Sequence, residues 1–223
     1  GMNTLKVGGS ATAMSGAPTY MDFYLLLDNT PSMGVGATTA DINKMVANTP
    51  DQCAFACHDK SAAPNDYYHL AKKLSVQMRI DVMRQATQQL MDTANGTQIM
   101  SGQFRMAIYT FGAAAENYGL TTVQSLTSNL STAKSSAGVI DLMTVPYQNY
   151  LGDTLTNFHS VLNGMNSLIP NPGDGSQSSA PQKILLHGHC QQKALCGTSP
   201  SQKVLSLPEN YSVEVIPSGC CGM

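Results

Sequence analysis

Residues 22–34 read Asp22-Phe23-Tyr24-Leu25-Leu26-Leu27-Asp28-Asn29-Thr30-Pro31-Ser32-Met33-Gly34, and this stretch decides the fold. The nearly continuous apolar run over residues 22–28 predicts a strand covered on both faces, because a strand with one solvated face alternates polar and apolar residues. The run ends in an acid, Asp28, and the hydroxyl residues Thr30 and Ser32 follow two positions apart. We therefore predict a buried strand that delivers oxygen ligands into a tight loop.

The composition limits the domain count and the kinds of partner. With 223 residues, the chain suits one α/β domain over residues 21–223 after a lead-in segment, 1–20. Its 12 Lys+Arg and 14 Asp+Glu give a net charge of −2, which argues against a nucleic acid or an anionic membrane as partner. Only 12% of residues are charged, a composition typical of secreted or surface bacterial proteins. No run of about 18 apolar residues occurs, so we expect neither a membrane span nor a signal peptide in this chain.

Helical and strand periodicities alternate after the first strand. Apolar residues recur every four between His69 and Ala94, which predicts one long amphipathic helix, and Gln103–Phe111 reads as a second buried strand. Strand, helix and strand in this order indicate a parallel sheet. We predict a three-layer, doubly wound α/β fold with a mostly parallel sheet and helices on both faces. Its further elements are a short helix at Ala40–Ala47, helices at Leu126–Ala137 and Phe158–Leu168, and strands at Lys183–Leu186 and Tyr211–Ile216.

A Cys-containing insertion at residues 34–68 separates the first strand from its helix. The chain has six cysteines, an even number in loop-like sequence, which favours disulfides in an oxidising compartment. They are Cys53, Cys57, Cys190, Cys196, Cys220 and Cys221, and the first four are the disulfide candidates. Cys53-x-x-x-Cys57-His58 is one residue too long for haem attachment, so we predict a local disulfide. Zinc binding by Cys53, Cys57 and His58 is the alternative, although adjacent ligands reach one ion poorly and no fourth ligand is evident.

The motif Asp28-x-Thr30-x-Ser32 resembles the metal-ion-dependent adhesion site (MIDAS) of von Willebrand factor A (vWA) domains. In that family a later loop adds a threonine in a Gly-Gly-Thr-x-Thr setting, which Gly152-Asp153-Thr154-Leu155-Thr156 matches. The resemblance implies that Asp28, Thr30, Ser32 and Thr154 bind Mg²⁺, Mn²⁺ or Ca²⁺, with Thr156 as the second choice. A hard cation held by few charges keeps a position open for a partner's carboxylate.

One corner of the family's site is missing from the sequence. The second acid usually follows a strand as Thr-Asp-Gly, whereas this chain reads Ile184-Leu185-Leu186-His187-Gly188-His189. Either Asp153 replaces that acid, or Asp28 acts alone through water, or the site is inert. The tail from residue 183 is atypical as a whole, and a shifted reading frame is one hypothesis for it.

The Cys-containing insertion directly after the motif resembles the vWA region of Tad/Flp pilus-assembly (TadG-like) proteins, over about residues 10–182. This resemblance implies a non-enzymatic adhesion module in the periplasm, the cell envelope or the extracellular space. Its expected partner is a pilus or envelope protein that offers an acidic residue, and the full-length protein is expected to carry an N-terminal anchor.

An enzyme is the disfavoured class, with an uncharacterised hydrolase as the less favoured alternative. A hydrolase would need a nucleophile beside a base and an orienting group, and no histidine stands at a catalytic spacing from such groups. The histidines are His58, His69, His159, His187 and His189.

Overall fold

The sheet of this computed structural model has five strands in the order β3-β2-β1-β4-β5. The structure describes residues 18–153, 155–188 and 212–215. Strands β2, β1, β4 and β5 are parallel, and β3 runs antiparallel to β2 at one edge. The predicted α/β class with a mostly parallel sheet is confirmed. The strands are β1 (Met21–Leu27), β2 (Phe104–Thr110), β3 (Thr121–Thr127), β4 (Gln182–Gly188) and β5 (Ser212–Val215).

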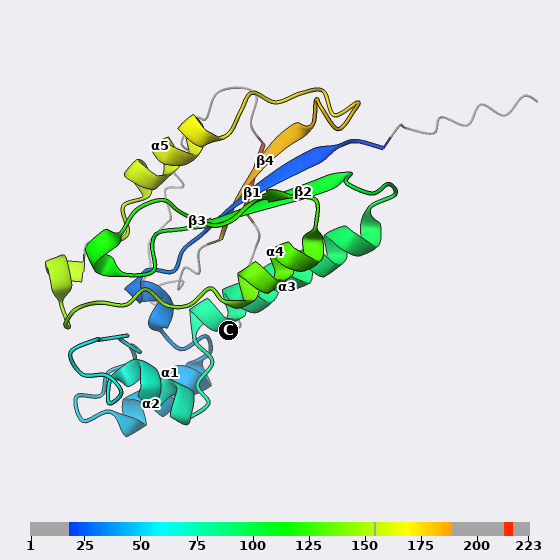
Figure 1. Ribbon diagram of the computed structural model, residues 1–223. Helices are drawn as coiled ribbons and strands as arrows, with labels where there is room; N and C mark the ends of the chain where they lie inside the picture. The colour runs from blue at the N-terminus through cyan, green and yellow to red at the C-terminus, as the bar shows by residue number, and fades with distance from the viewer. Residues whose placement is uncertain (1–17, 154, 189–211, 216–223) are drawn as a thin grey trace, which may run out of the picture.

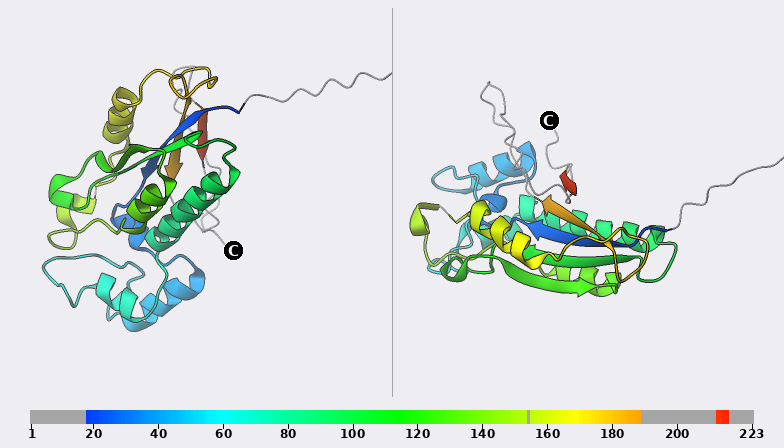
Figure 2. Two further views of the ribbon diagram at one scale, coloured as in Figure 1. Left: turned by 45° about the vertical axis from the view of Figure 1, so that its right-hand side comes forward. Right: turned by 90° about the horizontal axis from the view of Figure 1, so that it is seen from above.

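Helices cover both faces of this sheet, as predicted. Helices α3 (Arg79–Thr97) and α4 (Leu130–Gly138) lie on one face, and α5 (Phe158–Leu168) lies on the other (Figures 1 and 2). Alternate residues of β1 enter the two cores: Leu25 and Leu27 join the core under α3 and α4, while Tyr24 and Leu26 join the core under α5. The central strand is apolar throughout because both of its faces are buried.

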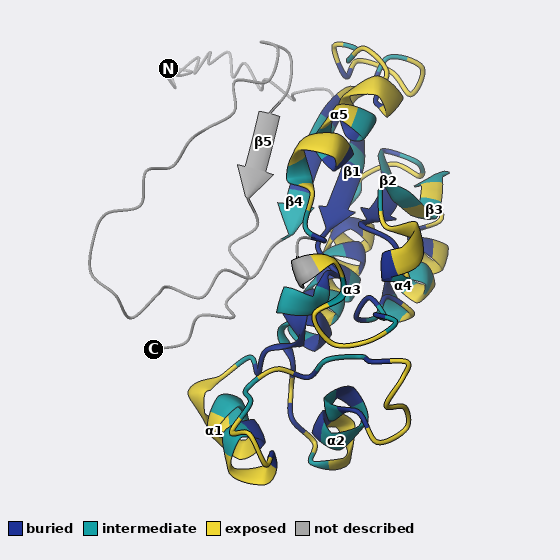
Figure 3. Ribbon diagram, turned by 90° about the vertical axis from the view of Figure 1, so that its left-hand side faces the viewer, coloured by how far each residue is buried: buried dark blue, intermediate teal, exposed yellow. Residues whose placement is uncertain are grey.

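The insertion after β1 forms a separate layer beyond the carboxyl ends of the strands (Figure 3). It comprises the 3-10 turn η1 (Pro31–Gly34) and the helices α1 (Thr39–Asn48) and α2 (Tyr67–Lys73). It ends later than the predicted residue 68, because Gly36 still pairs with Met78 directly before α3. Gly34 lies against the insertion so closely that an added Cβ would stand 2.7 Å from the Ala56 carbonyl oxygen.

The predicted single helix from His69 to Ala94 is wrong, because the chain breaks between α2 and α3. Ser75 adopts a left-handed conformation with φ of 52°, which ends α2, and Val76 N donates to the Ala71 carbonyl at 2.9 Å. Helix α3 then starts where the Asp81 carboxylate accepts a hydrogen bond from Met78 N at 3.0 Å. The apolar period continues across the break because residues on both sides contact the same core.

The edge strand β3 was not predicted, and the helix expected from Leu126 begins only at Leu130. β3 contains no residue that is fully buried, so it lacks the apolar run that marked the central strands. Asn129 caps α4 by accepting a hydrogen bond from Thr132 N at 3.0 Å. The predicted helices α1 and α5 and the predicted strands β4 and β5 are confirmed, and each of their ends lies within two residues of its predicted position. Two short 3-10 turns, η2 (Ala115–Asn117) and η3 (Tyr150–Asp153), complete the fold.

A buried ion triad fixes the register of the three central strands. Asp22 of β1 is fully buried and pairs in register with Arg105 of β2 and Lys183 of β4. Its carboxylate accepts from Arg105 Nε at 2.6 Å and Nη2 at 2.8 Å, and from Lys183 Nζ at 2.5 Å. The hydrogen bonds that Arg105 donates to Asp22 raise the pKa of Arg105, so the guanidinium stays charged. Because the carboxylate of the central strand is shared by cations on the two flanking strands, β2 and β4, a change of register in either strand would break an ion pair.

We predict that Asp22→Asn lowers the free energy of unfolding by about 3–5 kcal/mol, because it leaves two cations without their shared anion. Urea unfolding followed by circular dichroism measures the loss. Asp92→Asn is the matched control, since Asp92 forms an exposed pair with Lys134 at 2.7 Å and should cost less than about 1 kcal/mol. Equal losses in the two variants would contradict a register role for the triad.

Candidate functional site at the carboxyl ends of the strands

Asp28 lies at the carboxyl end of β1 and is fully buried. Its Oδ1 accepts hydrogen bonds from Thr30 N at 2.9 Å and from Thr30 Oγ1 at 2.7 Å. These two bonds close a tight turn of the Asx type over residues 28–30. The Asp28 N–H donates to the Gly188 carbonyl at the end of β4 at 3.0 Å. The carboxylate is therefore held at the point where two parallel strands end.

The Thr30 hydroxyl, which bonds this carboxylate, meets two further hydroxyl groups from two loops. Thr30 Oγ1 lies 3.3 Å from Ser32 Oγ and 2.8 Å from Thr156 Oγ1, which is 126 residues further along the chain. Thr156 stands directly before Asn157, whose side chain accepts from Ser160 N and caps α5. The helix cap thus positions the loop that brings Thr156 to the motif.

The structure brings together Asp28, Thr30 and Ser32, as the sequence predicted. From the later loop, the hydroxyl of Thr156, the second choice, contacts the Thr30 hydroxyl. Thr154 lies outside the described residues, and so does the side chain of Asp153, whose backbone ends η3. Their assignment as ligands stays a prediction.

The oxygen cluster has the dimensions of a site for a hard cation. Neighbouring ligands of octahedral Mg²⁺ lie about 3.0 Å apart, since each bond is about 2.1 Å. The observed oxygen separations run from 2.7 to 3.3 Å. They are also ordinary hydrogen-bond distances, so the cluster is satisfied without an ion. One carboxylate with neutral hydroxyls therefore fits a cation, and it also fits a stable, ion-free turn.

The described part of the chain shows no acid on β4, the strand after which the vWA pattern places its second aspartate. β4 runs beside β1, with Gly188 opposite Leu27, so its end lies next to Asp28. The strand supplies Lys183 and His187 but no carboxylate. His187 instead sets its ring edge-on to Phe158 of α5, with the ring centroids 4.9 Å apart.

Asn29 is a structural residue of the site that the sequence analysis missed. It is almost fully buried, and its amide donates to the Gly112 carbonyl at 2.7 Å and to the Asp141 carbonyl at 3.3 Å. Its Oδ1 accepts from Phe111 N at 3.1 Å, and its backbone carbonyl accepts from Met143 N at 2.8 Å. One side chain thus ties the motif to the end of β2 and to the loop after α4. Only its position inside the motif could have indicated this role.

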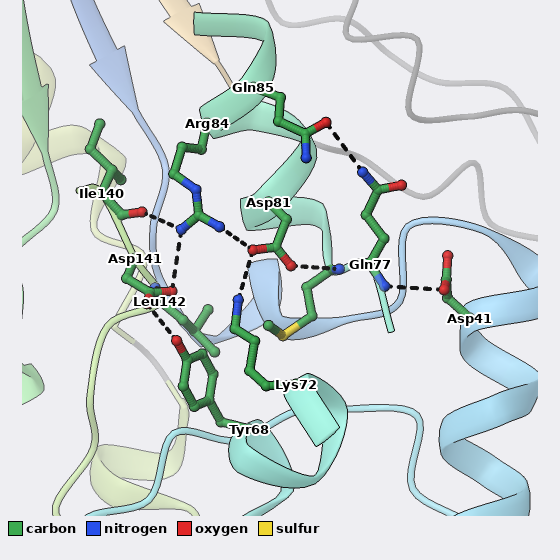
Figure 4. A network of polar contacts seen from close by, with 11 residues as sticks. Asp41, Tyr68, Lys72, Gln77, Asp81, Arg84, Gln85, Ile140, Asp141 and Leu142 are labelled. Carbon is green, nitrogen blue, oxygen red and sulfur yellow. Dashed lines mark hydrogen bonds and ion pairs between the residues drawn. The ribbon is translucent and has the colours of Figure 1, made fainter. Parts of the chain in front are cut away.

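A polar network connects the insertion to the same loop after α4 (Figure 4). Tyr68 of α2 donates its hydroxyl proton to the Asp141 carboxylate, and burial together with this bond raises the pKa of Tyr68. Arg84 of α3 donates to the Ile140 carbonyl at 2.8 Å and forms an ion pair with Asp81, which also accepts from Lys72 at 2.8 Å. The network fixes the insertion against the loop that supports Asn29.

The predicted local disulfide between Cys53 and Cys57 is wrong, because neither sulfur takes part in a disulfide. The Cys53 sulfur instead accepts a hydrogen bond from Phe55 N at 3.4 Å, and this local contact turns it toward its own chain segment. Cys190, Cys196, Cys220 and Cys221 lie outside the described residues, so pairing among them stays a prediction.

Comparisons with known proteins give fold-level likenesses only. No protein-family model matches the chain, and no curated protein matches it either. A D319A mutant of the PilB minor pilin from Streptococcus sanguinis is similar at 13% identity and a TM-score of 0.37, over 78% of this chain and 30% of the pilin. An uncharacterised membrane-spanning protein from Vibrio fischeri is similar at 12% identity and a TM-score of 0.35, over 75% of this chain and 70% of that one.

Both TM-scores are too low for either likeness to indicate what this chain binds or does. The chain also spans less than a third of the pilin. Among the helices of the described ranges, none is both long and apolar enough to cross a membrane.

We predict that Asn29→Ala lowers the free energy of unfolding by about 3 kcal/mol, because it leaves the buried Gly112 carbonyl and Phe111 N–H without hydrogen-bond partners. Chemical denaturation measures this loss. Asn163→Ala is the control, since Asn163 is exposed and its amide contacts only the exposed His159 ring in the described structure, at 3.1 Å. A loss below about 1 kcal/mol for Asn29→Ala would show that the motif loop does not depend on this amide.

Proposed function

We propose that this chain is a von Willebrand factor A domain that binds a partner protein through a divalent cation. The ligands are Asp28, Thr30, Ser32 and Thr156, and Mg²⁺ or Mn²⁺ is the cation. The proposal rests on one observation: the Thr30 hydroxyl, which donates to the Asp28 carboxylate at 2.7 Å, also lies 3.3 Å from Ser32 Oγ and 2.8 Å from Thr156 Oγ1 of a distant loop. The position of the motif at the carboxyl ends of β1 and β4 suits this assignment, since ligands of open α/β sheets bind at the carboxyl ends of the strands.

The chain's own residues prepare the cluster for such a role. The Asp28 carboxylate is the single charge, and hydroxyl groups supply neutral oxygens, so a bound cation keeps most of its charge. That charge is what the ion would supply for holding a partner's carboxylate. Asn29 and the Asn157 cap hold the two loops in place, and neither group needs to move for the oxygens to meet. The chemistry is binding and not bond breaking, in keeping with a non-enzymatic module.

The proposed setting is bacterial pilus assembly or surface attachment, in the periplasm, the cell envelope or the extracellular space. Support comes from the insertion, which follows the motif as in TadG-like proteins and lies at the same end of the sheet as the site (Figure 3). A partner that offers a carboxylate to Asp28 and its hydroxyls would meet α1 and α2 on the same side. The insertion therefore supplies the surface that would distinguish one acidic partner from another.

A metal-free scaffold with the same fold is the second candidate function. Two observations favour it: β4 brings no carboxylate to the site, and Asp28 Oδ1 already accepts two hydrogen bonds from Thr30. In this case the insertion alone would bind the partner.

Calorimetric titration with Mn²⁺ and Mg²⁺ tests the cation site. We predict one site in the wild type and a loss of affinity of about tenfold or more in Thr156→Val, which removes one ligand and keeps the side-chain shape. Thr144→Val is the matched control, because the Thr144 hydroxyl contacts the Ala113 carbonyl at 3.3 Å and lies outside the oxygen cluster. Asp28→Asn should abolish the heat. Absence of heat from the wild type with both ions would select the metal-free scaffold.

A further inference from the structure

A second group of metal-ligating side chains lies inside the insertion. His58, Asp66 and His69 each offer one ligand atom, and these atoms lie within 4.8 Å of one another. The His58 and His69 rings meet edge to face with centroids 5.7 Å apart. Ligands of tetrahedral zinc stand about 3.4 Å apart, so each atom would need to move by less than about 1 Å.

Two polar atoms of this group lack a hydrogen-bond partner within the described structure. They are His58 Nδ1 and Asp66 Oδ2, and both are buried. The Asp66 side chain is only 1% exposed, while His69 is 41% exposed. A buried carboxylate oxygen without a partner is costly, and a bound cation removes that cost. The exposed His69 leaves an entry path from solvent.

The backbone and neighbouring rings hold the ligands in place before any ion binds. The His58 carbonyl accepts from Val145 N at 2.9 Å, and its ring stacks on Tyr68 at 4.0 Å. Asp66 caps α2 by accepting from His69 N at 2.9 Å, and its same oxygen contacts His69 Nδ1. Two of the ligands are thus fixed by the start of one helix, and the third by a stack on that helix.

We propose that His58, Asp66 and His69 form a zinc site that fastens the loop before α2 to the start of α2. Two imidazoles and one carboxylate are a ligand set that zinc accepts. Soft ions, which prefer sulfur ligands, and hard ions, which prefer oxygen ligands alone, fit this set less well. The fourth position faces solvent through His69 and takes water or a side chain from a partner. This ligand set differs from Cys53, Cys57 and His58, which the sequence suggested, and shares only His58 with it.

Zinc titration of the whole chain in excess Mg²⁺ tests the proposal, with Co²⁺ as a spectroscopic probe. We expect one Zn²⁺ per chain and a cobalt spectrum without sulfur-to-metal charge transfer. Asp66→Asn keeps the helix cap, since asparagine caps as well as aspartate, but should weaken zinc binding about tenfold or more. His69→Ala should do the same. His159→Ala is the control, because His159 is exposed and lies on α5.

Two outcomes would overturn the zinc site. Zinc binding that survives both Asp66→Asn and His69→Ala would show that these residues are not ligands. A sulfur-to-cobalt band that disappears in Cys53→Ser would assign the ion to the cysteines. Circular dichroism of each variant confirms folding, and the Thr156→Val variant should bind zinc like the wild type, so this result is independent of the proposed Mg²⁺ site.

Discussion

The Asp22 carboxylate, shared by Arg105 and Lys183 at 2.5 to 2.8 Å, is the constraint on which the site depends. It acts at the amino-terminal end of the sheet, six residues before Asp28 along an extended strand. Because parallel strands in fixed register end together, setting Asp22 beside Lys183 also sets Leu27 beside Gly188. A one-residue slip of β4 would turn its side chains to the opposite faces and move its end away from the motif.

A second set of contacts explains why the insertion can be long without disturbing the site. The chain leaves β1 at Asp28 and begins α3 after Met78, and contacts at the ends and in the middle hold the segment between them. The ends meet where Gly36 pairs with Met78, and the middle is fixed by the Tyr68 hydroxyl on Asp141. Asp141 also offers its backbone carbonyl to Asn29. Motif, insertion and the loop after α4 therefore form one hydrogen-bonded unit.

The sequence predicted those parts of the fold and of the candidate site that depend on local patterns. Strands β1 and β2 could be predicted because strands buried on both faces are apolar throughout. The spacing of Asp28, Thr30 and Ser32 predicted that these side chains share one tight loop. The break at Ser75 was not, because residues before and after it face the same core and keep the helical period. Edge strand β3 has no apolar run, and the contact between Thr156 and Thr30 depends on where a loop folds, which spacing alone does not determine.

The two proposed cation sites differ in chemistry, and this difference keeps them from competing. Asp28 and its hydroxyls offer only oxygen atoms, which suit a hard ion such as Mg²⁺, whereas His58, Asp66 and His69 include two nitrogens, which favour zinc. The sites are nevertheless connected mechanically. His58 stacks on Tyr68, Tyr68 bonds Asp141, and Asp141 bonds Asn29 beside the motif. An ion that holds His58 against α2 would limit the positions open to Tyr68, and so would stiffen the support of the motif loop without touching it.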